Sequence, residues 1–187
     1  MSQWDSVDTS AYDRKWAEMA NKGHNPHGEA DFVARFAPQS VLDAGCGTGR
    51  LAVELAGRGA ATVGVDLDGP MIDAARAKAP DLEWHHADLA SVRLERTFDA
   101  VVMAGNVMIF VAPGSQSAVM DTMAAHVSPG GVLISGFQLG RGLDVATYDQ
   151  MAHRAGLTLI ERFATWDGAP FLETSDYGLS VHRQAAS

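Results

Sequence analysis

The sequence predicts an α/β domain in which helices cover both faces of a mostly parallel sheet of seven strands. From residue 40 onward, short apolar runs alternate with longer segments in which apolar residues recur every three or four positions. The runs at 100–103 and 132–134 are apolar without interruption, as strands buried on both faces are. Parallel strands need a connection of about a dozen residues, which a helix supplies. We therefore expect three layers, with the sheet between two layers of helices.

Residues 39–187 are expected to form the α/β core. The expected strands are 40–44, 61–65, 82–86, 98–103 and 131–137, and the expected helices are 70–79, 116–127, 143–155 and one that carries Leu51 and Leu55. Two further strand-like runs, 157–166 and 177–182, have only a turn-rich piece between them, which predicts an antiparallel hairpin at one edge of the sheet. Residues 1–38 are expected to form a helical cap with helices at 10–20 and 28–36.

The composition indicates a single globular domain spanning 1–187, because 187 residues fit the usual domain size. The net charge is −9 and no basic cluster exceeds the pair Arg14-Lys15, which disfavours a nucleic acid partner. No apolar run approaches the ~20 residues that cross a bilayer. A lone cysteine, Cys46, and an N-terminus without a signal pattern predict a cytoplasmic protein. A homodimer is left open.

Polar residues and glycines gather where the expected strands end. In open α/β sheets, ligands bind outside the carboxyl ends of the strands. These strand-end residues are Asp43, Gly45, Gly47, Gly49, Asp66, Asp88, Gly105 and Asn106. Read from Gly47, the chain matches the dinucleotide fingerprint G-x-G-x-x-[GA], with Asp66 in the place of the ribose carboxylate. A nicotinamide-dependent oxidoreductase is therefore one interpretation.

Asp43 distinguishes this loop from an ordinary dinucleotide site. Its carboxylate would lie close to a bound pyrophosphate and repel it. The same carboxylate would favour a ligand that carries an ammonium group, directly or through water. The structural alternative is that Asp43 ties down the loop by accepting hydrogen bonds from backbone amides. For Asp66 the alternative is a helix cap, which Asp68 or Gly69 could equally supply, and for Asp88 it is a strand-end turn.

The segments 41–49, 63–67, 86–89, 98–102 and 129–131 together resemble the class I S-adenosylmethionine-dependent methyltransferases, in the family's order and spacing. The resemblance covers about 41–137 and implies a three-layer Rossmann-like fold. It implies that Gly45 and Gly47 line the methionine part of the cofactor and that Asp66 accepts from both ribose hydroxyls. It also implies that Leu67 and Met71 enclose the adenine and that Asp88 and the Leu89 amide read the adenine edge. The remaining predicted cofactor residues are Cys46 and Gly49 in the glycine loop, Gly105 and Asn106 beside the methyl group, and Tyr12 and His27 in the cap.

The predicted function is methyl transfer from S-adenosylmethionine to a small-molecule acceptor. In-line transfer needs chiefly alignment of the reactants, so no catalytic residue is assigned. The seven histidines show no metal-ligand spacing, and no metal is expected. The Cys46 thiol is expected to be inert, and the methionines to pack in the core. Besides the oxidoreductase, a non-catalytic protein that binds S-adenosylmethionine remains an alternative.

Overall fold

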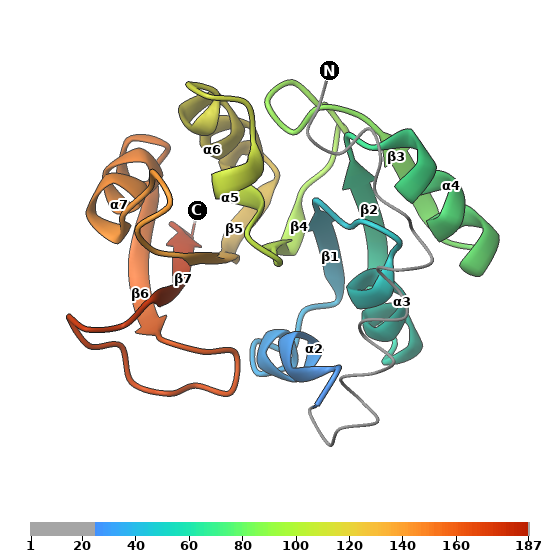
Figure 1. The fold of residues 1–187 in the computed structure, drawn as a ribbon. Helices are drawn as coiled ribbons and strands as arrows, with labels where there is room; N and C mark the ends of the chain where they lie inside the picture. Colours follow the sequence, from blue (N-terminus) through green and yellow to red (C-terminus); the bar gives the residue numbers. More distant parts are fainter. Residues whose placement is uncertain (1–24, 187) are drawn as a thin grey trace.

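The structure, a computed structural model, describes residues 25–186. The helix expected at 10–20, with Tyr12, lies outside these residues. One seven-stranded sheet has the order β3-β2-β1-β4-β5-β7-β6 (Figure 1). The strands are β1 Ser40–Ala44, β2 Ala61–Asp66, β3 Glu83–His86, β4 Phe98–Met103, β5 Val127–Gln138, β6 Leu157–Phe163 and β7 Tyr177–Gln184. The predicted seven-stranded, mostly parallel sheet is confirmed.

The C-terminal hairpin is also confirmed, at the end of the sheet opposite β3 (Figure 1). Its second strand, β7, lies between β5 and β6 and runs antiparallel to both. All other neighbouring strands pair in parallel. The strand β6 therefore joins the sheet only through β7.

Helices cover both faces of the sheet, as expected (Figure 1). They are α2 Gly28–Ala34, α3 Arg50–Gly57, α4 Gly69–Lys78, α5 Val107–Phe110, α6 Gln116–Ala125 and α7 Val145–Arg154. Side chains of α2 and α3 cluster with one face of the central strands, and those of α5, α6 and α7 cluster with the other. The alternation of Val41 and Leu42 between these two clusters follows from the two-residue period of a strand.

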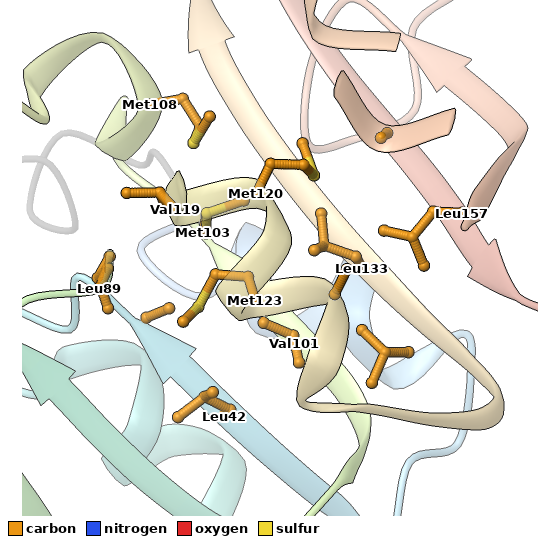
Figure 2. Packing of buried hydrophobic residues seen from close by; sticks show 14 of the residues in the cluster. Leu42, Leu89, Val101, Met103, Met108, Val119, Met120, Met123, Leu133 and Leu157 are labelled. Atoms are coloured by element: carbon orange, nitrogen blue, oxygen red, sulfur yellow. The ribbon is translucent and has the colours of Figure 1, made fainter. Parts of the chain in front are cut away.

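The larger core cluster is rich in methionine, as predicted. Met103, Met108, Met120 and Met123 are fully buried and lie in one cluster with Val101 and Leu133 (Figure 2). They come from β4, α5 and α6, so unbranched, adaptable side chains fill the space between these helices and the sheet.

The boundaries of several helices differ from the expectation for local reasons. The helix α7 begins at Val145 because the Asp144 side chain caps it, accepting from the Thr147 amide at 2.7 Å. The helix α2 ends at Ala34, just before Ala37 takes a positive φ of 46°. The four-residue helix α5 was not expected, since one turn is too short to show a periodic pattern.

Candidate cofactor site

The strand order reverses at β1, which pairs with β2 on one side and β4 on the other. Ligands of open α/β sheets bind at such a point, outside the carboxyl ends of the strands. The glycine loop, residues 45–49, starts here. The amides of Gly45 and Cys46 both donate to the Val65 carbonyl, at 2.8 and 3.0 Å. The loop is therefore attached to β2 from its first residue.

Packing against one indole explains the last glycine of this loop. Gly49 precedes α3 with a φ of 80°, and a Cβ there would overlap Trp84 Cη2 and lie 3.0 Å from Trp84 Cζ3. A Cβ at Gly64 of β2 would overlap the same ring. The Cys46 side chain is buried beside the indole, and burial raises the pKa of its thiol, which keeps the sulfur protonated. A buried, protonated thiol is a poor nucleophile, and the inertness of Cys46 stays a prediction.

Asp66, the last residue of β2, joins two loops through its carboxylate. It accepts from the Gly47 amide at 2.7 Å through Oδ2 and from the Asp68 amide at 2.9 Å through Oδ1. Burial raises its pKa above the ordinary aspartate value. Each carboxylate oxygen can accept more than one hydrogen bond, so capacity remains for a pair of hydroxyls. The cap of α4 is Asp68, which accepts from the Met71 amide at 2.9 Å.

An exposed leucine lies directly after Asp66. The Leu67 side chain is 58% exposed, although large apolar side chains are usually buried. Its carbonyl accepts from His86 Nε2 at 2.9 Å, a contact that ties the β2 tip to the β3 tip and that the sequence did not suggest. Met71 is buried below, in the first turn of α4. An exposed apolar side chain held at a strand tip fits one side of a flat aromatic ligand.

The next strand tip carries Asp88 and Leu89. Asp88 is exposed, and its Oδ1 accepts from the Ala90 amide at 2.8 Å, as in an ordinary turn. The Leu89 side chain lies in the main core, so only its backbone can face a ligand. Both residues stand at the same edge of the sheet as Asp66 and remain predicted cofactor contacts.

The Asp43 carboxylate is buried beneath the glycine loop. It is 1% exposed and accepts from the Ala52 amide of the first turn of α3 at 3.1 Å. Burial raises its pKa to about 7, while the nearby Arg50 guanidinium opposes that rise. The structure therefore shows Asp43 bonded to a backbone amide just beyond the loop, which agrees in kind with the structural alternative at this position. Its contact with a ligand ammonium group remains a prediction.

The β4 tip is held by Asn106, which has a φ of 70°. Its Oδ1 accepts from the Gln138 amide at 2.7 Å, and its own amide donates to the Gly136 carbonyl at 3.3 Å. Gly105, before it, is exposed with a φ of 74°. The side chain of Asn106 thus fastens the tips of β4 and β5 to one another, beside the start of the glycine loop.

The structure does not bring His27 to these strand tips. Its Nδ1 lies 3.2 Å from Glu54 Oε2 on α3, and its side chain is 44% exposed. The link between this segment and the loop is Arg50, which donates to the Pro26 carbonyl at 2.6 Å and pairs with the buried Glu29. Sequence reasoning missed Arg50 and Glu29, which are 21 positions apart.

The charges around the loop suit a ligand without phosphate. The Glu29 and Asp66 carboxylates lie close enough to Asp43 that each adds to the rise in its pKa. Two cationic side chains lie near the loop. Arg50 forms an ion pair with Glu29, and Lys78 donates to the Thr48 hydroxyl at 3.3 Å. The Asp66 carboxylate would repel a pyrophosphate placed beside it, whereas it would attract an ammonium or a sulfonium. Within residues 25–186, no three His, Cys, Asp or Glu side chains are grouped to hold a metal ion.

Comparison with known proteins places the chain among methyltransferases. Residues 41–131 match the family model of the methyltransferase domain. A dTDP-3-amino-3,6-dideoxy-alpha-D-glucopyranose N,N-dimethyltransferase of Streptomyces fradiae is 34% identical over 120 residues, 60% of this chain and 47% of that protein. A trans-aconitate 2-methyltransferase of Azoarcus is 32% identical over 117 residues, 62% of this chain and 42% of that protein. The chain spans about half the length of the curated relatives that it matches.

The solved structures extend the likeness beyond the matched domain. A TehB-like SAM-dependent methyltransferase from Corynebacterium glutamicum has a TM-score of 0.87 and is 33% identical, with 94% of this chain and 97% of that chain covered. This match confirms the predicted Rossmann-like methyltransferase fold. The chain belongs to the class I S-adenosylmethionine-dependent methyltransferases.

Proposed function

We propose that this chain transfers a methyl group from S-adenosylmethionine to a small-molecule acceptor. The observation that carries the proposal is the β2 tip, where the Asp66 carboxylate bridges two loops and Leu67 stands exposed beside it. Together they offer acceptors for ribose hydroxyls and an apolar surface for adenine. The cofactor would supply the activated methyl group, and the chain's own residues would hold and align the reactants.

The binding site would run along one edge of the sheet. Asp88 and Leu89 at β3 would meet the adenine, Asp66 at β2 the ribose, and Gly45 and Gly47 at β1 the methionine part. This order follows the neighbouring strands β3, β2 and β1, so the methyl group would face β4, where Gly105 and Asn106 lie. Cys46 and Gly49 would contribute through the loop backbone.

The proposal for a small-molecule acceptor is supported by the relatives named above, whose names specify an amino sugar and a tricarboxylic acid. The net charge of −9 supports the expectation that nucleic acid is not the substrate. Residues 25–186 contain no helix with the length and apolar character of a membrane span. A cytoplasmic location, a single domain over 1–187 and a homodimer in solution stay predictions.

Calorimetric titration tests the cofactor site. Wild-type protein should bind S-adenosylhomocysteine, and Asp66→Asn should weaken binding about 10–100-fold by losing charge-assisted hydrogen bonds. Asp68→Asn is the matched control, because Asp68 has the same side chain two residues on and serves as a cap. Equal losses in both variants, or tight binding of NAD with none of S-adenosylhomocysteine, would contradict the proposal.

A turnover assay separates an enzyme from a binding protein. Release of S-adenosylhomocysteine should be measured with S-adenosylmethionine and a panel of amino sugars, hydroxy acids and polycarboxylic acids. At least one acceptor should give multiple turnovers. Binding of the cofactor without turnover on any acceptor would favour the non-catalytic alternative.

A further inference from the structure

The strands beyond β4 flank the acceptor side of the site, given the proposed cofactor placement. Neighbouring strands lie about 4.8 Å apart, so β5 stands about 10 Å from β1 and β7 about 14 Å from it. The cofactor occupies the tips of β3, β2 and β1 in this arrangement. Side chains at the tips of β5 and β7 would therefore face the methyl acceptor.

Tyr177 begins β7 at this edge, paired with Gln138, the last residue of β5. The Tyr177 hydroxyl lies against Gly136. A Cβ added at Gly136 would overlap this hydroxyl and would lie 3.1 Å from Trp166 Cζ2. The Gly136 carbonyl accepts from the Asn106 amide at 3.3 Å. Gly136 is thus the shared neighbour of the Tyr177 hydroxyl and of Asn106, the residue predicted to border the methyl group.

Trp166 holds this hydroxyl in place. Its Nε1 donates to Tyr177 Oη at 3.0 Å. The indole packs edge-on against Phe32 of α2, with ring centroids 5.6 Å apart, and the loop after β6 reaches toward α2 (Figure 1). The Trp166 ring is fixed by packing, so the direction of its N–H is fixed as well.

The Tyr177 hydroxyl has hydrogen-bonding capacity to spare. A phenol can donate one hydrogen bond and accept two, and Trp166 uses one of the acceptor positions. Within residues 25–186 the phenolic proton meets no acceptor. Burial raises the pKa of Tyr177 to about 12, so the group is a neutral hydroxyl at physiological pH. A half-buried hydroxyl, fixed on one side and unsatisfied on the other, is suited to a polar ligand.

We propose that the Tyr177 hydroxyl, oriented by Trp166, hydrogen-bonds the methyl acceptor and positions its nucleophilic atom toward the methyl group. The acceptor class is a small molecule with a hydroxyl, amine or carbonyl oxygen next to the nucleophilic atom. Tyr177 is a positioning residue that stays neutral throughout, and the ring bodies of both side chains have the separate role of packing the hairpin on α2. The inference rests on the proposed methyl transfer.

Kinetics of three variants with the best acceptor from the panel above test the proposal. Tyr177→Phe removes only the hydroxyl and should lower kcat/KM for the acceptor about tenfold, with KM raised and kcat reduced. Gly136→Ala keeps the hydroxyl but displaces it, and should cause a similar loss. Trp166→Phe removes the orienting N–H and should cause a smaller loss.

Tyr148→Phe is the matched control, because it makes the same chemical change in α7 on the opposite face of the sheet. It should leave kcat/KM unchanged. In all variants the dissociation constant of S-adenosylhomocysteine should stay within about twofold of wild type, which a general loss of structure would not allow. Unchanged kcat/KM in Tyr177→Phe would overturn this inference alone. Cofactor binding without turnover on any acceptor would overturn it together with the acceptor proposal.

Discussion

Replacing Gly49 by alanine should destabilise the protein through two additive effects. A left-handed backbone costs a residue with a Cβ roughly 1–2 kcal/mol. The new Cβ would also overlap Trp84 and lie 3.2 Å from Ala75 Cβ, and overpacking of this kind typically costs about 1–3 kcal/mol. The sum is about 2–5 kcal/mol. With an m value of about 2 kcal/mol/M, the urea midpoint should fall by about 1–2.5 M.

Gly114→Ala is the matched control for the backbone effect. Gly114 has a φ of 84°, close to the 80° of Gly49, but a Cβ there would meet nothing within 4 Å. Its midpoint should fall by only about 0.5–1 M. The change in unfolded-chain entropy on replacing glycine by alanine is common to both variants and cancels in the comparison.

A double-mutant cycle isolates the contact with the indole. In a Trp84→Phe background the outer atoms of the indole are gone, so Gly49→Ala should cost less than it does in wild type. Equal shifts of the urea midpoint for Gly49→Ala and Gly114→Ala would show that the Trp84 indole does not exclude a side chain at Gly49. Absence of any coupling in the cycle would lead to the same conclusion.

Three further variants test single contacts. Burial raises the pKa of Asp43 from 3.8 to about 7, so between pH 4 and 7 the native state binds more protons than the unfolded state. The free energy of unfolding should therefore fall as pH rises through this range, by on the order of 4 kcal/mol. Urea unfolding of Asp43→Asn should lack this dependence on pH. Asp144→Ala should lower the Tm in thermal unfolding, because the Thr147 amide loses its hydrogen-bond acceptor, and an unchanged Tm would refute the cap. Asn106→Gly and Asn106→Ala should both lose the hydrogen bond that the Gln138 amide donates to the Asn106 side chain. Only the alanine also strains the left-handed backbone, so Asn106→Ala should be about 1–2 kcal/mol less stable than Asn106→Gly. Equal stabilities of the two variants would contradict the strain.

The sheet and the location of the candidate site residues at the strand tips could be predicted because their signals are local. Buried strands show as apolar runs, and the aspartates and glycines follow those strands directly in the sequence. Asp68, which caps α4, was one of the candidates that the sequence offered for the same reason. Each of these features depends on residues within a few positions of one another.

What could not be predicted depends on contacts between distant positions. Asp43 is buried because the first turn of α3 packs against its carboxylate. A side chain at Gly49 is excluded by the indole of Trp84, which is 35 positions away in the sequence. His27 could have faced the loop or the solvent side of α3, and only packing of α2 decided between them. Side-chain direction in such cases follows from tertiary packing, which no short pattern encodes.

The position of β7 has a consequence for how the chain reaches its folded state. Because β7 separates β6 from β5, the first strand of the hairpin has no place in the sheet until the second has been synthesised. On the ribosome, β1 to β5 can pair as they emerge, but β6 and its apolar side chains must wait for residues 177–184 to leave the exit tunnel. The same order places Tyr177 late in the chain, so its proposed contact with the acceptor can form only after β7 has joined the sheet.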